Sequence, residues 1–331
     1  MMTDNYNISA FYSATFQTKP MLYCSWGDGM RKLSWLIAVV VTLLIPYLSF
    51  RILEQIQPEP PPPSKITEPP QSQSKVDRQV TVLQPDGKIL AMDLEEYVGR
   101  VLSGEMPMSF DIEALKAQAV AIRTYTMRKA EGKGKHDNAD VCTDSSCCQA
   151  YADIITDEQK LADAIEDTRG QVLTYDGKPI EATYFSATGG STEDAVAVWG
   201  TDVPYLKAQP SPEEIEPKTV TFTVKQLQDR LQLDSLPHTV EKLSYTDGGG
   251  VASIRIGGRT FSGTEFRRLL SLPSTSFHIS IIGDNCNITV KGNGHRVGMS
   301  QYGAETMALA GRAYYEVLEY YYPGTELVVM E

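Results

Sequence analysis

The alternation of apolar and polar residues that marks packed structure begins near Gln79. Residues 79–83 (QVTVL) and 89–92 (ILAM) form short apolar runs of the kind found in β-strands, and the turn-forming sequence PDGK at 85–88 separates them. This pattern predicts a β-hairpin at the start of the globular part of the chain.

After the hairpin, the apolar residues recur at the spacing of a helix and no longer at alternate positions. The apolar residues on one face of the first predicted helix are Leu94, Tyr97, Val98, Val101 and Leu102. Asp93, with Glu96 three positions later, forms an acidic capping box at its start. The helix must end close to Glu105, because Met106 precedes a proline and is disfavoured in the α conformation. A second helix is predicted from 112 to about 130.

The remaining pattern mixes both kinds of element. It predicts a Cys-rich loop at 131–150, a helix at 158–168, strands at 171–175, 180–186 and 288–291, short strands and helical pieces within 219–277, and a last helix at about 300–322. Runs of strands and runs of helices follow one another without a regular βαβ repeat. We therefore predict an α+β fold.

The N-terminal part has a different pattern. No charged residue interrupts the apolar run from Leu33 to Phe50, which is long enough to cross a bilayer as a helix, and two basic residues precede it. We predict a short cytoplasmic N-terminus at 1–32, of which 1–29 lie upstream of an alternative start, and a transmembrane signal-anchor at 33–53. A cleaved signal peptide is the competing interpretation, although no small-x-small cleavage site follows the run.

The segment 54–78 is rich in proline, glutamine, serine and glutamate and nearly lacks apolar residues, which predicts an extended linker. The globular domain is then 79–331. The net charge of −12 and the absence of a basic stripe argue against a nucleic-acid partner.

The cysteine cluster is compatible with two chemistries. His136, Cys142, Cys147 and Cys148 lie close together in the sequence and supply four ligands of the kind that bind tetrahedral Zn²⁺. With all four positions filled by protein, such a zinc would be structural and would not activate water. The alternative is a disulfide, either within this cluster or with Cys286, which an extracytoplasmic location favours.

Three segments carry a family resemblance. They are LEEYVGRVLSGEMPMSFDIEALKAQAVAIRTY at 94–125, IEATYFSATGGSTEDAVAVWGTDVPYLKA at 180–208 and GNGHRVGMSQYGAETMALAG at 292–311. Together they resemble the SpoIID/LytB family, the stage II sporulation protein D family of peptidoglycan lytic transglycosylases, over essentially all of 79–331. The resemblance implies two lobes around a glycan cleft, with 219–277 as the smaller inserted lobe. Some family members also carry a zinc site of mixed His and Cys ligands in the cysteine loop.

The resemblance implies that Glu105, in the EMP motif, is the catalytic residue. Members cleave the MurNAc–GlcNAc bond of glycan strands that lack stem peptides, with the C6 hydroxyl of the sugar as nucleophile, so a single carboxylate suffices as acid and then base. The local sequence agrees, because the negative end of the helix dipole and the apolar neighbours Met106, Met108 and Phe110 would raise the pKa of Glu105. Taken alone, a solvated helix-end carboxylate is the commoner outcome.

Further candidates for substrate binding come from the same motifs. They are Thr188, Gly189, Gly190, Trp199, Tyr205, His295, Ser300, Gln301, Tyr302 and Arg123. The glycines permit close approach of a sugar to backbone, and the aromatic rings either stack on sugars or fill the core. His295 is either a ligand contact or a structural histidine, and Arg123 is either an ionic contact to the cleft or solvated. In place of an aromatic residue expected from relatives, the sequence 210–214 reads PSPEE.

The implied partners are peptidoglycan glycan strands and, during sporulation engulfment, an amidase and a membrane partner. The resemblance also implies a single-pass location in the mother-cell membrane, with the catalytic domain facing the intermembrane space. Two alternative functions remain at this point. One is a non-catalytic peptidoglycan-binding enhancer of an amidase, and the other is a zinc-dependent cell-wall amidase.

Overall fold

The computed structural model describes residues 78–132, 134–153 and 158–330. The predicted N-terminus (1–32), anchor (33–53) and nearly all of the linker (54–78) lie outside these residues. Within the described ranges, no helix has both the length and the apolar character needed to cross a bilayer. The longest of them, α3 (Ile112–Glu131), carries charged residues along its length. The described residues therefore do not support the predicted single-pass location in the cell membrane.

The predicted hairpin is present. Strands β1 (Gln79–Leu83) and β2 (Ile89–Asp93) pair antiparallel, with Gln79 opposite Asp93 and Leu83 opposite Ile89. A short strand, β3 (Val141–Cys142), pairs parallel to β1 on its other side. This pairing attaches the cysteine loop to the start of the domain.

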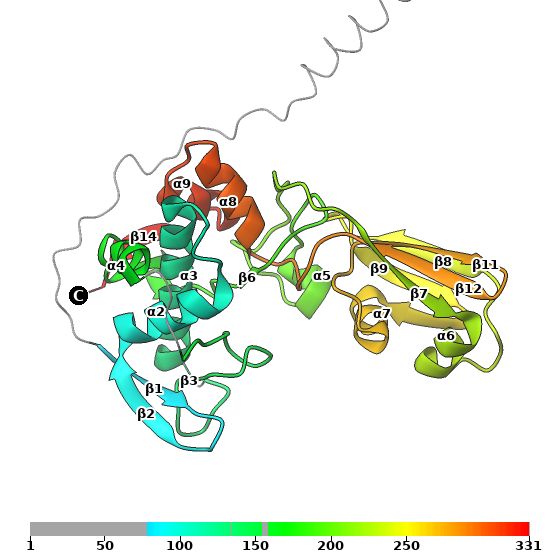
Figure 1. The fold of residues 1–331 in the computed structure, drawn as a ribbon, viewed down its shortest axis with the longest axis horizontal. Helices are drawn as coiled ribbons and strands as arrows, with labels where there is room; N and C mark the ends of the chain where they lie inside the picture. Colours follow the sequence, from blue (N-terminus) through cyan, green and yellow to red (C-terminus); the bar gives the residue numbers. More distant parts are fainter. Residues whose placement is uncertain (1–77, 133, 154–157, 331) are drawn as a thin grey trace, which may run out of the picture. The chain divides into compact units, whose positions relative to one another are not determined.

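The two predicted helices follow. The side chain of Asp93 accepts hydrogen bonds from two backbone N–H groups in the first turn of α2 (Leu94–Glu105), and α2 ends before Pro107 as predicted. Asp111 caps α3 in the same way through the N–H of Glu113. Figure 1 shows α3 among the other helices, and it packs against α2, α4, α8, α9 and strand β4.

Short helices and strands complete this packing, and among them β4 has the predicted bounds. They are α4 (Glu158–Glu166), β4 (Gln171–Tyr175), β5 (Lys178–Pro179), β6 (Tyr184–Phe185), α5 (Ala195–Trp199), β13 (Met299–Ser300), α8 (Gln301–Leu309), α9 (Tyr314–Tyr321) and β14 (Glu326–Val329). The predicted strand at 180–186 keeps strand geometry only at β6, where two residues pair parallel with β13. The predicted last helix is two helices, because Gly311 adopts the left-handed conformation (φ 86°) that ends α8. We call the hydrophobic cluster built from residues 80–206 and 297–322 the first core.

A second, separate hydrophobic cluster lies within residues 218–290, and we call this cluster the second core. Its elements are β7 (Lys218–Thr223), α6 (Val224–Leu231), β8 (Val240–Tyr245), β9 (Val251–Ile256), β10 (Arg259–Ser262), α7 (Gly263–Leu270), β11 (Phe277–Ile282) and β12 (Asn285–Val290). They form two three-stranded antiparallel sheets, in the orders β10-β9-β8 and β11-β12-β7. Helices beside small mixed and antiparallel sheets confirm the α+β class.

Candidate functional site

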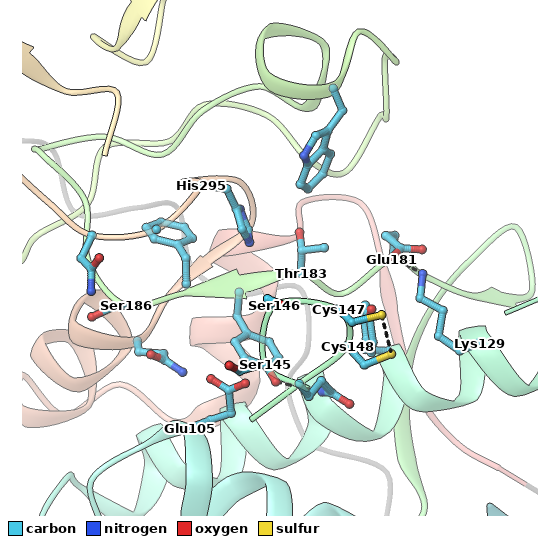
Figure 2. Close-up of a pocket in the computed structure, with 18 of the residues that line it drawn as sticks. Glu105, Lys129, Ser145, Ser146, Cys147, Cys148, Glu181, Thr183, Ser186 and His295 are labelled. Atoms are coloured by element: carbon cyan, nitrogen blue, oxygen red, sulfur yellow. Dashed lines mark hydrogen bonds and ion pairs between the residues drawn. The ribbon is translucent and has the colours of Figure 1, made fainter. Parts of the chain in front are cut away.

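A cavity of about 960 Å³ lies at the C-terminal end of α2. Its wall joins segments that are far apart in sequence: Glu105 from α2, the cysteine loop at 145–149, the stretch 181–186 around β6, and the glycine-rich segment 293–295. Figure 2 shows Glu105, His295 and the cysteines around this space. Trp199 and Gln301 also line it. The structure therefore brings four residues predicted for catalysis or substrate binding to one cavity, together with two of the predicted metal ligands: Glu105, Trp199, His295 and Gln301, with Cys147 and Cys148.

Glu105 is the last residue of α2, and its side chain is only partly exposed. The backbone N–H of Ala150 donates a hydrogen bond of 2.7 Å to Oε1 of Glu105. Burial raises the pKa of the carboxyl, although the Ala150 N–H and the side chains of Gln301 and Tyr184 partly offset this. The net direction is upward, which keeps a proton on Glu105 at a higher pH than for a solvated glutamate. Because Oε1 is occupied by the Ala150 N–H, Oε2 is the atom available to carry that proton.

Tyr184 belongs to the surroundings of Glu105, and sequence reasoning did not single it out. Gln149 Nε2 donates to the Tyr184 hydroxyl at 2.8 Å, and Gln149 Oε1 accepts from Thr126 Oγ1 at 3.2 Å and from Tyr97 Oη at 3.4 Å. Since the Tyr184 oxygen accepts from Gln149, its own proton is free to be donated elsewhere. Burial holds the pKa of Tyr184 well above its usual value, so the hydroxyl stays protonated. The signal in the sequence was the tyrosine within the quoted motif EATYFS.

Gln301 is the first residue of α8 and is 6% exposed. Its Nε2 makes no hydrogen bond within the described part of the chain, although its amide is near enough to lower the pKa of Glu105. A buried amide beside a carboxylate, with two N–H groups, can donate both to Glu105 and to a ligand in the cavity.

His295 and Trp199 lie in ring contact, with centroids 5.4 Å apart and planes at 52°. Phe185 contacts the His295 ring as well, at 5.7 Å. Trp199 is 45% exposed, so it does not simply fill the core. The backbone N–H of Val297 donates to Nδ1 of His295 at 3.1 Å.

Two further predicted residues serve a different, buried carboxylate. The Thr188 backbone N–H and the Ser300 hydroxyl both donate to Oε1 of Glu213, at 2.8 and 2.6 Å, and Ser211 donates to Oε2. All of these side chains are buried, and the described cavity lining includes none of them. Sequence reasoning noted 210–214 only for a missing aromatic residue and so missed Glu213.

The other predicted residues also lie away from the lining. Arg123 is fully buried and pairs with Glu95, and Tyr302 packs edge-on against Phe110 with centroids 5.1 Å apart. The buried Tyr205 accepts a hydrogen bond at its hydroxyl from the backbone N–H of Glu181. Gly189 and Gly190 line a smaller space of about 320 Å³ instead.

The cysteine loop brings its four predicted ligands together. One ligand atom from each of His136, Cys142, Cys147 and Cys148 lies within 4.8 Å of the others. His136 Nε2 is 3.7 Å from Cys147 Sγ and 3.5 Å from Cys148 Sγ, and the two sulfurs are 4.0 Å apart. Bonds of about 2.3 Å to sulfur and 2.0 Å to nitrogen place neighbouring ligands of tetrahedral zinc about 3.5–3.8 Å apart. The three separations among His136, Cys147 and Cys148 are close to these values, so the set is a candidate site for the ion.

The state of the cysteines disagrees with the disulfide alternative. Bonded sulfurs lie about 2.05 Å apart, and the four cysteines of the described chain are all free. Cys286 is buried in the second core, on β12.

Comparisons with known proteins agree with the motifs. The SpoIID family model, described as stage II sporulation protein, matches residues 86–175. Stage II sporulation protein D of Bacillus subtilis (strain 168) is 38% identical over 253 residues, covering 71% of this chain and 74% of that protein, and the Bacillus amyloliquefaciens protein of the same name gives the same figures. An amidase enhancer of Bacillus subtilis is 29% identical over 287 residues, covering 69% of this chain and 39% of that protein. The chain therefore belongs to the stage II sporulation protein D family, with the role of a cell-wall-acting enzyme in sporulation.

Proposed function

We propose that the chain is a lytic transglycosylase that cleaves MurNAc–GlcNAc bonds of denuded peptidoglycan glycan strands, with Glu105 as general acid and then base. The observation that carries the proposal is a glutamate with a raised pKa in a cavity of about 960 Å³, held through one oxygen by a backbone N–H. A raised pKa favours the acid form that a general acid needs.

The charges around Glu105 favour a mechanism with one carboxylate. Of the described residues that line the cavity, only Glu105 and Glu181 carry carboxyl groups. Glu181 accepts a hydrogen bond of 2.5 Å from Lys129 Nζ and lies 3.8 Å from Arg128, so it is already paired with two cations. A glycosidase that uses two carboxylates needs the second one free as nucleophile or base. Glu181 is poorly suited to either task.

The reaction can be written with Glu105 alone. Oε2 donates its proton to the glycosidic oxygen, the bond from that oxygen to C1 breaks, and the leaving sugar departs with the proton. The Ala150 N–H and the side chains near Glu105 stabilise the carboxylate that remains. Oε2 then accepts the proton of the C6 hydroxyl as the C6 oxygen bonds to C1, which closes the 1,6-anhydro ring. No water is consumed, and Glu105 regains its proton.

His136, Cys142, Cys147 and Cys148 are proposed to hold Zn²⁺. The ion would stabilise the loop and supply no catalytic chemistry, because four protein ligands leave no open position. Gln149 and Ala150 follow the last ligand directly, and both contribute to the surroundings of Glu105. The loop bound to zinc would therefore hold the donor to Oε1 in place.

Partners follow from the proposed substrate. Denuded strands arise when an amidase removes stem peptides, so we propose that such an enzyme acts before this one. The membrane partner implied by the family resemblance remains a prediction.

The similarity to an amidase enhancer supports a second candidate function, that of a non-catalytic binding protein. A zinc-dependent amidase is the third, and it would release stem peptides.

The decisive experiment compares Glu105→Gln with Glu96→Gln, both in the full chain. Glu96 is the matched control, because it lies on the same helix but is exposed and pairs with Arg100. Each protein is incubated with denuded glycan strands, and 1,6-anhydro sugars are measured by mass spectrometry. We expect Glu105→Gln to lower the rate by about 10²- to 10⁴-fold and Glu96→Gln to leave it unchanged. Absence of anhydro products from the unaltered chain, or equal yields from Glu105→Gln, would contradict the proposal.

A further inference from the structure

Glu213, between α5 and β7, is a buried carboxylate that lies outside the lining of the Glu105 cavity. We propose that Glu213 is a positioning residue that fixes the first turn of α8 through Ser300. The fixed turn holds the amide of Gln301 beside the carboxyl of Glu105. The inference rests on the proposed function of Glu105 and adds to it a residue that acts from outside the cavity.

Ser300 connects Glu213 to α8. Its hydroxyl donates to Oε1 of Glu213 at 2.6 Å, and its oxygen accepts from the backbone N–H of Gly303 at 3.1 Å, which makes Ser300 the N-cap of the helix. Because a hydroxyl has one proton, donation to Glu213 leaves the lone pairs of Ser300 for the helix. The other acceptor within reach, the Ser186 carbonyl, is farther away at 3.5 Å. Glu213 therefore sets the rotamer of the cap.

Gln301 directly follows this cap. Its side chain is buried, lines the cavity, and carries an amide close enough to Glu105 to donate to it. A rotation or shift at the start of α8 would move this amide relative to the carboxyl. Misplacement of a group at a reaction centre by about 1 Å can lower a rate about 100-fold. The cap is therefore a point from which Glu213 can affect the reaction.

The same carboxylate oxygen also fixes a second part of the cavity wall. The backbone N–H of Thr188 donates to Oε1 of Glu213 at 2.8 Å. Ser186, two residues earlier, lines the cavity (Figure 2), and its carbonyl accepts from the backbone N–H of Tyr302 at 3.0 Å. Glu213 thereby joins the segment 186–188 to the first turn of α8.

Glu213 is itself held through its other oxygen. Oε2 accepts from Ser211 Oγ, which lies 2.6 Å from the Tyr321 hydroxyl on α9. A Cβ at Gly303 would overlap this hydroxyl and lie 2.8 Å from Oε2, so the glycine is what lets α8 approach so closely. Both carboxylate oxygens thus have partners within the protein, which suits a group that fixes geometry.

The test is a double-mutant cycle on the release of anhydro sugars by the full chain, at a temperature where circular dichroism shows every variant folded. Glu213→Leu removes the acceptors, and Gln301→Leu removes the amide. We expect each to lower kcat by about 10- to 100-fold. The double variant should be no slower than Gln301→Leu, because both changes remove the same contact. Glu214→Leu, at the exposed neighbouring position, is the matched control and should leave kcat unchanged.

A conservative variant separates positioning from a general loss of stability. Glu213→Gln keeps an oxygen that can accept from Ser300 and Thr188, so it should retain most of the rate that Glu213→Leu loses. Losses that multiply in the double variant of the cycle would overturn the inference. An equal loss of kcat in Glu213→Gln and Glu213→Leu would also overturn it.

A spectroscopic measurement does not depend on turnover. In the ¹⁵N-glutamine-labelled chain, the side-chain amide signal of Gln301 is the one that Gln301→Leu removes. Glu105→Leu should shift this signal, and the shift should vanish when Glu213→Leu is also present. Ser300→Ala breaks the link but keeps the carboxylate, so it should abolish the shift as well, and it replaces Glu213→Leu if that variant does not fold. An undiminished shift in the presence of Ser300→Ala would contradict the inference. Failure of the proposed reaction would appear instead as missing anhydro products from the unaltered chain, with this response intact.

Discussion

The first and second cores of this chain accommodate polar groups in different ways. The second core buries apolar side chains, and Ser274 and Thr275 are the polar residues of 218–290 that are buried. The first core and the loops joined to it bury charged and amide groups, among them Arg123, Glu95 and Gln149. No residue of 218–290, all of which are described, lines the cavity around Glu105. The comparison indicates that the costly buried polar groups are concentrated in the part of the chain that also contains the proposed site, although pairs such as Arg123–Glu95 lie outside the cavity lining.

The largest expected effect on stability comes from the buried ion pair. Arg123 Nε and Nη2 donate to the two carboxylate oxygens of Glu95 at 2.8 and 2.5 Å. Arg123→Met would leave the Glu95 carboxylate buried without its cation, which costs about 3–5 kcal/mol of unfolding free energy. Arg255→Met, which breaks the exposed pair with Glu241 in the second core, should cost about 0–1 kcal/mol. Urea unfolding at neutral pH measures both, and equal losses would contradict the contrast between the cores.

That ion pair also shows what the sequence could and could not predict. Local signals sufficed for α2, because Asp93 and Pro107 lie next to its ends, and for the clustering of the four proposed metal ligands, which are close in sequence. Arg123 was predicted as a cleft residue or a solvated one because its partner lies 28 positions earlier, on another helix. No pattern in the local sequence predicts such a contact.

Separation in the sequence also explains why Thr188 and Ser300 were predicted from their motifs as substrate-binding residues and not as partners of a buried carboxylate. Their acceptor, Glu213, is separated from them by 25 and 87 positions. The predicted strand at 180–186 failed for a related reason, since its length depends on the partner strand β13, which offers two residues. The sequence supplied candidate functional residues, but their hydrogen-bond partners could be found only in the tertiary structure.

The next largest effect on the unfolding free energy is expected at the proposed zinc site. Cys148→Ser should remove bound zinc and lower the unfolding free energy by about 2.7 kcal/mol when free zinc is at a hundred times its dissociation constant. The matched control is Cys286→Ser, a buried cysteine of the second core that should change packing and leave zinc content unchanged. Elemental analysis gives the metal content, and unfolding with and without chelator gives the stability. Zinc retained by Cys148→Ser, or absent from the unaltered chain, would contradict the site.

The smallest effect is the pH dependence of stability at Glu105. Its pKa in the folded chain is raised, mainly by burial, so its favourable contribution is present below the unfolded pKa and lost as pH rises through the folded value. Glu105→Gln removes this titration. The variant should therefore match the unaltered chain in acid and become the more stable of the two as pH rises, which unfolding experiments across that range will measure.

Glu241 in the second core should behave in the opposite way. Hydrogen bonds from the Gly258 backbone N–H and from Arg255 lower the pKa of this exposed carboxyl. Its contribution is present above the unfolded pKa and is lost as pH falls through the folded value, so Glu241→Gln should be slightly less stable than the unaltered chain near neutral pH and equal to it in acid. If both variants shift stability in the same direction with pH, then burial does not set the difference between the two carboxylates. Opposite signs would show that burial destabilises the ionised form of Glu105, whereas hydrogen bonds stabilise the ionised form of Glu241.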